Sequence, residues 1–92
     1  MAKDQKAKNS KNQVTPKLEI KAEHQVLTGK YCNFALIQHS RNEFIYNFIL
    51  TIEQQSQLVS RIITSPSHAK AILKALQQNI EKYEKTYGKI TD

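Results

Sequence analysis

The sequence predicts an α+β fold in which four antiparallel strands are followed by one long C-terminal helix (ββββα). Two observations support this fold class. Apolar residues alternate or cluster in four short segments between residues 17 and 64, and they then recur at helical spacing over residues 69–87. The segments are joined by short polar connections, as in an antiparallel meander. With 92 residues in all, we expect a single domain over residues 17–92, preceded by a tail over residues 1–16.

The predicted tail is rich in Lys, Asn, Gln and Ser and has no apolar periodicity. A segment of this composition cannot bury enough apolar surface to offset the conformational entropy lost on ordering, so we expect it to be disordered. Residues 1–17 contain five lysines and one aspartate, which gives four of the six net positive charges of the chain. Most of the basicity is therefore expected on the tail.

The first strand is predicted over residues 17–23, where Leu18 and Ile20 begin an alternation of apolar and charged side chains. A period of two indicates a strand with one buried face and one solvent face. Residues 24–30 are expected to end this strand and to connect it to the next, with Gly29 as the turn residue.

The second and third strands are predicted over residues 33–39 and 43–52, with a three-residue polar loop that is typical of a hairpin. The fourth strand is predicted over residues 58–64, after a polar connection at residues 53–57. The third strand is apolar on both faces, so both faces should be covered. One face carries Phe44, Tyr46, Phe48 and Leu50, and the other carries Ile45 and Ile49 with Asn47 between them.

A long helix is predicted to begin after Ser65 and to end near Gly88. Ser65 is a favourable N-cap, and Pro66 stands at the first helical position, where its missing N–H costs nothing. Gly88 can adopt the left-handed conformation that ends many helices. One apolar stripe of about six turns runs between these ends, formed by Ala69, Ile72, Leu73, Leu76, Ile80, Tyr83 and Tyr87.

A single helix covers only one face of a small sheet, so the second apolar face needs another cover. Exposing Ile45 and Ile49 would forgo roughly 1.5–3 kcal/mol for each side chain. The cover is either an identical subunit or the strand and loop edges of the same chain. We expect a homodimer with two-fold symmetry. The residues expected at its interface are Ile45, Ile49, Ile80, Tyr83 and Tyr87.

The composition argues against catalysis, metal binding and a membrane location. Cys32 is the only cysteine, which excludes an internal disulfide and a Cys-based zinc site. The three histidines fall on different predicted elements, and no phosphate-binding glycine loop or nucleophile–base pair is present. No apolar run approaches the ~20 residues of a membrane helix, and no secretory signal is recognisable. We expect a cytoplasmic protein that is not an enzyme and has no cofactor.

The basic residues suggest a nucleic-acid partner. A lysine-rich tail neutralises phosphates whatever the nucleotide sequence. A sheet with aromatic faces and cationic edges is suited to binding single-stranded nucleic acid. The alternative is that the aromatic residues form the core and the tail serves solubility. The contacts expected with nucleic acid are Lys3, Lys6, Lys8, Lys11, Lys30, Tyr31, Arg41 and Arg61.

Two segments, GKYCNFALIQHSRNEFIYNF and SRIITSPSHAKAILKALQQNIEKYEKTYGKI, carry a recognisable pattern. The pattern resembles the DUF3467 family of small bacterial and archaeal proteins over roughly residues 18–90. Two departures stand out: Asn47 replaces the usual Asp, and residues 53–57 replace a longer loop. The resemblance implies a small cytoplasmic bacterial protein and no particular activity. The matching positions are Tyr31, Asn33, His39, Ser40, Glu43, Phe44, Asn47, Phe48, Arg61, Ile62, Ile63, Pro66, His68, Ala69, Lys70, Asn79, Tyr83, Glu84, Gly88 and Ile90.

A fainter resemblance concerns the order of elements and the Ile–Ile–x–Ser–Pro–x–x–Ala junction at residues 62–69. These are similar to the single-strand-binding transcriptional coactivators and the plant Whirly proteins. That resemblance implies dimers formed through the helices and DNA bound on the sheet. Two functions are therefore considered: a dimeric module that binds nucleic acid, especially single strands, or a structural or adaptor protein that docks an unidentified protein partner.

Overall fold

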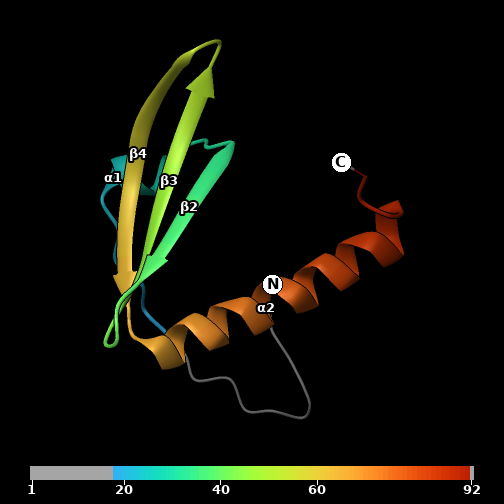
Figure 1. Ribbon diagram of the computed structural model, residues 1–92. Helices are drawn as coiled ribbons and strands as arrows, with labels where there is room; N and C mark the ends of the chain where they lie inside the picture. The colour runs from blue at the N-terminus through green and yellow to red at the C-terminus, as the bar shows by residue number, and fades with distance from the viewer. Residues whose placement is uncertain (1–17, 92) are drawn as a thin grey trace.

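The computed structural model describes residues 18–91, which form an α+β fold (Figure 1). Its three strands make one antiparallel sheet in the order β2-β3-β4, so β3 is central. A three-stranded sheet followed by a C-terminal helix agrees with the predicted fold class. The elements are α1 (His24–Thr28), β2 (Phe34–His39), β3 (Phe44–Ile52), β4 (Gln55–Thr64) and α2 (Pro66–Tyr87).

The predicted first strand is wrong over the part of it that the structure describes. Residues 18–23 pair with no strand, and α1 follows them directly as a short helix. Leu18 and Ile20 are both exposed, so their alternation with charged residues buries nothing. Alternation stabilises a strand only where a neighbouring edge and an apolar layer are available. Gly29 does act as a turn residue, since it follows α1 with φ of 77°.

The tail predicted over residues 1–16 lies outside the described residues. The same is true of four residues expected to contact nucleic acid, which are Lys3, Lys6, Lys8 and Lys11.

The hairpin of β2 and β3 confirms the prediction to within one residue at each end. Its register pairs His39 with Phe44. The loop between them is closed by a 2.9 Å hydrogen bond from Ser40 N to Glu43 O. The His39 ring stacks on Phe44 with 5.6 Å between the ring centroids.

Strand β4 begins at Gln55, three residues earlier than predicted. Ile52 pairs with Gln55, so the turn is only two residues long, and Glu53 adopts a φ of 57° within it. The polar residues that were expected to form a connection therefore extend the strand, because backbone pairing with β3 requires no apolar side chain. A register shift follows, in which Phe48 pairs with Ser60 and Ile49 pairs with Leu58. The intervening residue makes a β-bulge.

Helix α2 has the predicted ends. The hydroxyl of Ser65 accepts a 3.3 Å hydrogen bond from His68 N and lies 3.0 Å from His68 Nδ1. Such a side-chain cap satisfies one of the free N–H groups of the first turn. At the other end, Gly88 has φ of 99°, and its N–H donates to Glu84 O at 2.9 Å.

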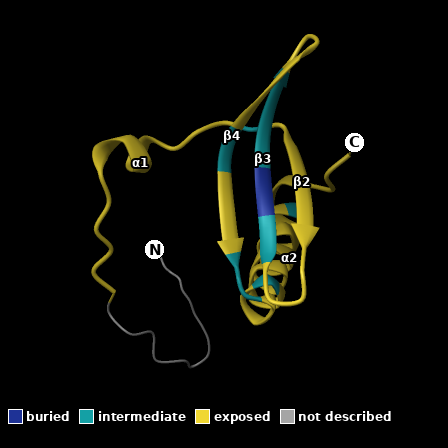
Figure 2. Ribbon diagram, turned by 60° about the vertical axis from the view of Figure 1, so that its left-hand side comes forward, coloured by how far each residue is buried: buried dark blue, intermediate teal, exposed yellow. Residues whose placement is uncertain are grey.

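Helix α2 extends away from the sheet and does not cover either of its faces (Figure 1). Within the described residues, the extensive contacts between elements are those of β3 with β2 and with β4. Burial is therefore concentrated on the central strand, as Figure 2 shows. Of residues 18–91, only Tyr46 and Asn47 are buried, with 8% and 4% of their surface exposed. The part of the chain that the structure describes thus leaves much apolar surface of the sheet and of α2 exposed.

Candidate interaction surface

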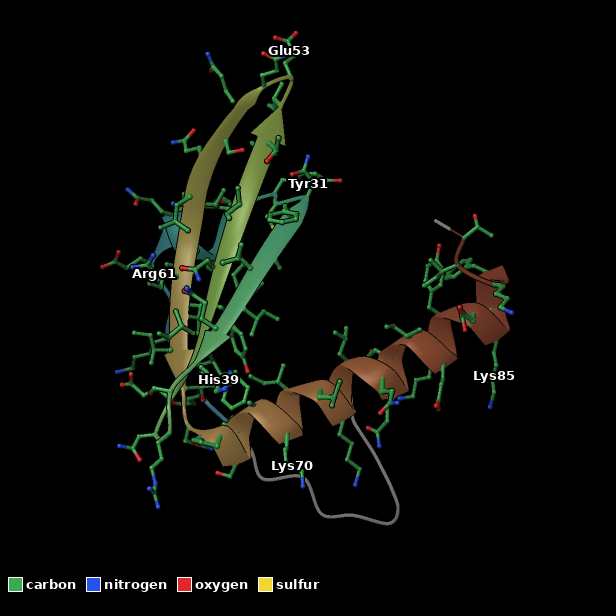
Figure 3. All side chains as sticks on the ribbon, viewed as in Figure 1. Tyr31, His39, Glu53, Arg61, Lys70 and Lys85 are labelled. Carbon is green, nitrogen blue, oxygen red and sulfur yellow. The ribbon has the colours of Figure 1, made fainter. Side chains whose placement is uncertain are left out.

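The sheet carries one formal charge. Strands β2 and β3 contain no Asp, Glu, Lys or Arg, and β4 contributes Arg61 alone. The nearest acidic residues in sequence are Glu43 and Glu53, which lie beyond the two ends of β3. Figure 3 shows Glu53 at the tip of the β3–β4 hairpin and Arg61 midway along β4. The arginine is therefore set within a surface that has no acidic residue.

A row of hydrogen bonds links Arg61 across all three strands. The register places Asn47 opposite Arg61 on one side and opposite Leu36 on the other. Arg61 Nε donates to Asn47 Oδ1 at 2.6 Å. Asn47 Nδ2 donates to Leu36 O at 2.9 Å and to Gln38 Oε1 at 3.0 Å. The buried amide is thus satisfied at its oxygen and at its nitrogen, as buried polar groups generally must be.

The face of the sheet that carries Arg61 is called the arginine face below. Alternation along the strands and the pairing register assign its members: Phe34, Leu36, Gln38, Ile45, Asn47, Ile49, Leu58, Arg61 and Ile63. The prediction that Ile45, Asn47 and Ile49 share a face is thereby confirmed. Phe34, Leu36 and Ile63 are exposed, so the polar row runs through an apolar surface that is only partly covered.

Most aromatic side chains of the sheet lie on the other face. Tyr46 and Phe48 contact each other there, with 6.2 Å between ring centroids, and Tyr46 is buried. They form part of the small core, which was the alternative considered from the sequence. On the sheet and the segment that leads into it, the aromatic residues that remain accessible for stacking are Tyr31 and Phe34, which are 78% and 52% exposed.

The residues predicted to bind nucleic acid do not form one cluster within the described part of the chain. Figure 3 shows Tyr31 and His39 at opposite ends of β2. Arg41 follows in the loop after His39. Six residues of strand span roughly 20 Å, which separates these two side chains widely. Arg61 lies between the two ends, on the opposite edge strand.

Lys30 belongs to a separate feature, a pocket of about 490 Å³ between α1 and the sheet. Its lining combines residues of α1 and the following segment with residues of β3 and β4: Gln25, Val26, Gly29, Lys30, Cys32, Phe48, Val59 and Ser60. Phe48 and Ser60 point to the face opposite Arg61, because they alternate with Asn47 and Arg61 along their strands. The pocket is therefore distinct from the arginine face.

Sequence reasoning missed the structural roles of two amides. Asn47 was noticed as a polar residue between two isoleucines, and that position was a usable signal for a polar row. Asn33 gave no such signal. Its Nδ2 donates to Thr51 O and its Oδ1 accepts from Thr51 N, both at 2.9 Å. The Asn33 side chain thus makes the pair of hydrogen bonds that a neighbouring strand residue would make. It holds the segment before β2 against β3, two residues after Tyr31.

The residues predicted for a dimer interface lie on two separate surfaces. Ile45 and Ile49 are half-buried on the arginine face. Ile80, Tyr83 and Tyr87 lie on α2 and are exposed, with 4.9 Å between the Tyr83 and Tyr87 ring centroids. Both surfaces are apolar and are not covered by another element of residues 18–91, and the homodimer stays a prediction.

Two further features bear on function. Over residues 18–91, His, Cys, Asp and Glu side chains form no group of three or more that could hold a metal ion. Neither described helix combines the length and the apolar character that a membrane crossing requires.

The family of the chain follows from a comparison with family models. The model described as "Protein of unknown function (DUF3467)" matches residues 1–92. The chain belongs to the DUF3467 family. Comparison of this DUF3467 chain with curated proteins and with solved structures finds no match. The fainter likeness to the Whirly proteins and the single-strand-binding coactivators therefore has no support.

Proposed function

We propose that this DUF3467 protein binds single-stranded nucleic acid on the arginine face, with the lysine-rich N-terminal segment adding electrostatic affinity. The observation that carries the proposal is the position of Arg61. It is held by a buried asparagine in the middle of a sheet that has no acidic residue.

The hydrogen bond to Asn47 leaves most of the guanidinium available for a ligand. It uses the Nε–H of Arg61, and an arginine has four more N–H groups on its two Nη atoms. These groups fit the geometry of a phosphate, which they can bind in a bidentate manner. Fixing Nε in advance reduces the side-chain entropy that would be lost when a phosphate binds.

An exposed aromatic side chain on the same face supplies a second kind of contact. Phe34 is opposite Ile49, while Arg61 is opposite Asn47 two residues away. The two side chains are separated by two strand spacings, about 10 Å across the sheet, and by two residues, about 7 Å, along it. Stacking of a base on an aromatic ring contributes about 1–3 kcal/mol and depends little on sequence. A single strand of nucleic acid that crosses the sheet would contact both side chains.

The wider charge distribution favours the approach of a polyanion. Residues 18–91 contain nine basic and six acidic side chains, a net charge of +3. Residues 1–17 add four further net positive charges. The acidic residues of the described part lie outside the strands, so a phosphate on the arginine face meets no carboxylate of the sheet.

The proposal is tested by titrating fluorescent single-stranded DNA of mixed sequence with the full chain and following fluorescence anisotropy. We expect binding that weakens steeply as salt is raised. Arg61→Gln should reduce affinity by about tenfold, in line with the worth of a charge-assisted hydrogen-bond pair. The matched control is Arg41→Gln, which removes the same charge from a loop at the end of the sheet. Equal losses in the two variants would contradict a role for the arginine face.

A second candidate, an adaptor that docks another protein, is favoured by the uncovered apolar surface. Exposed Leu36 and Ile63 lie on the same face of the sheet as Arg61, and exposed Leu73 and Leu76 lie on α2. Contiguous exposed apolar surface often marks a protein interface. Adaptor function predicts a protein that co-purifies at fixed stoichiometry after nuclease treatment. Nucleic-acid binding predicts that the same treatment removes the bound material.

A further inference from the structure

Six apolar residues of α2 follow a stricter pattern than an amphipathic stripe requires, while Ala71, Ile72 and Ala75 lie beside that pattern. The six are spaced by four, three, four, three and four residues, which is the alternation of a and d positions in a coiled coil. The residues are Ala69, Leu73, Leu76, Ile80, Tyr83 and Tyr87. All but Ala69 are exposed, and Tyr87 is 74% exposed. Among residues 18–91, α2 therefore provides a coiled-coil seam on which no other element packs extensively.

The spacing of these six residues is palindromic, because it is the same when counted from either end of the helix. A two-fold axis near residue 78 would place Ala69 opposite Tyr87 of a second copy. It would likewise place Leu73 opposite Tyr83, and Leu76 opposite Ile80. The smallest side chain then faces one of the largest, and two aliphatic side chains of similar size meet beside the axis. Large residues facing small ones allow close packing along the seam.

The charges beside the seam match the same arrangement. Lys70 and Glu84 flank the seam on one side, at equivalent heptad positions. About the same axis, Lys70 of each copy comes beside Glu84 of the other, which gives two pairs of opposite charge. Glu84 Oε2 accepts a hydrogen bond from Ile90 N at 3.0 Å, and its other oxygen is available for the pair. In a parallel pair, Lys70 and Glu84 of the two copies would lie about 21 Å apart along the axis.

The surroundings of α2 leave room for a second helix. Within residues 18–91, the helix has no extensive contact with the strands. Lys70 and Lys85 point away from the sheet along its outer side (Figure 3). The seam runs over about 27 Å of helix, and most of that length extends beyond the sheet (Figure 1).

From the palindromic spacing and the matching charges we propose that α2 pairs with α2 of a second copy, antiparallel, about a two-fold axis near residue 78. Such a contact is isologous, with each residue pair occurring twice. The inference does not rest on nucleic-acid binding. The predicted interface includes three residues of this helix, Ile80, Tyr83 and Tyr87. The proposal specifies the register and the orientation in which they pair.

A charge-swap series measured by size-exclusion light scattering tests this pairing. At ~50 µM the full chain should give a mass near twice 10.6 kDa. Lys70→Glu and Glu84→Lys should each raise the dimer dissociation constant by about tenfold or more, because each places two pairs of like charges together. Both substitutions in one chain should restore most of the affinity. Lys85→Glu, which makes the same charge change at the heptad position opposite the seam, should have little effect.

Circular dichroism of each variant reports whether α2 still folds, so that a loss of helix is not taken for a loss of pairing. A monomeric wild-type chain at ~50 µM would overturn the proposal. So would a dimer that responds equally to Lys70→Glu and Lys85→Glu, or one in which the double swap restores nothing while helicity is kept. The first result excludes self-pairing, and the other two exclude this register.

Discussion

Arg61 Nε donates a 2.6 Å hydrogen bond to Oδ1 of Asn47, the least exposed residue among residues 18–91. The same amide donates to Leu36 O and to Gln38 Oε1 on the opposite edge strand. One side chain thus joins all three strands and orients the only charged group of the sheet. Stability of the sheet and presentation of the arginine depend on the same residue.

Asn47→Ala is expected to destabilise the fold. The substitution leaves the partners on both neighbouring strands unpaired in a partly buried setting, where each unsatisfied group costs about 1–3 kcal/mol. Urea denaturation should show a lower free energy of unfolding by about 2 kcal/mol. Gln57→Ala, at an exposed position of β4, is the control and should change stability little. Equal stability of the Asn47 variant and the wild type would contradict the structural role of the polar row.

Asn33→Ala is expected to loosen the start of the β2–β3 hairpin. The side chain makes two 2.9 Å hydrogen bonds to the backbone of Thr51, one of them from the Thr51 N–H. Without it, that amide should exchange with solvent faster, by about tenfold for a loss near 1.4 kcal/mol. Hydrogen exchange followed by NMR measures the rate. The amide of Tyr46, at the centre of the same strand, serves as an internal control, and unchanged exchange at Thr51 would disprove the role.

Ser65→Ala is expected to weaken the first turn of α2. The Ser65 hydroxyl accepts from His68 N, and loss of such a cap costs about 1 kcal/mol. Thermal denaturation followed by circular dichroism should show a lower midpoint. Ser67→Ala is the matched control, because Ser67 touches the Ser65 hydroxyl at 3.2 Å and caps no backbone N–H in the described structure. A larger effect from the Ser67 variant would reverse the assignment of the cap.

Deletion of residues 1–16 is expected to reduce the salt dependence of nucleic-acid binding. The segment contains four lysines, and each phosphate neutralised on a single strand contributes about 0.7 to the slope of log affinity against log salt. The slope should therefore fall by up to about 3, while weaker binding that depends on Arg61 persists. The slope is obtained from anisotropy titrations at several salt concentrations. An unchanged slope would show that the lysines make no phosphate contacts.

The parts of the fold that the sequence predicts well are those with local signals. Ser65, Pro66 and Gly88 mark the ends of α2 by their own backbone chemistry, and the hairpin loop between His39 and Phe44 is short and polar. The predicted first strand is wrong although Leu18 and Ile20 have the right spacing, because residues 18–23 pair with neither outer strand of the sheet and both side chains stay exposed. Pairing is a property of the tertiary structure, and a single segment does not encode it.

The candidate site was predictable only in part, for a related reason. Arg61 could be selected as a basic residue on a strand, but its partner depended on the register between β3 and β4. That register is set by a two-residue turn and a bulge beside Ile49, and the polar residues before Leu58 had suggested a longer loop. Asn47 and Gln38 therefore emerged as partners of Arg61 only in the folded sheet.

The most direct test of the proposed function is the affinity of the full chain for single-stranded DNA, with and without Arg61→Gln, at ~50 mM salt. The proposal predicts binding at micromolar protein that Arg61→Gln weakens by about tenfold and Arg41→Gln leaves nearly unchanged. Absence of binding by the wild-type chain, or equal affinities for the wild type and Arg61→Gln, would contradict a nucleic-acid interface on the arginine face.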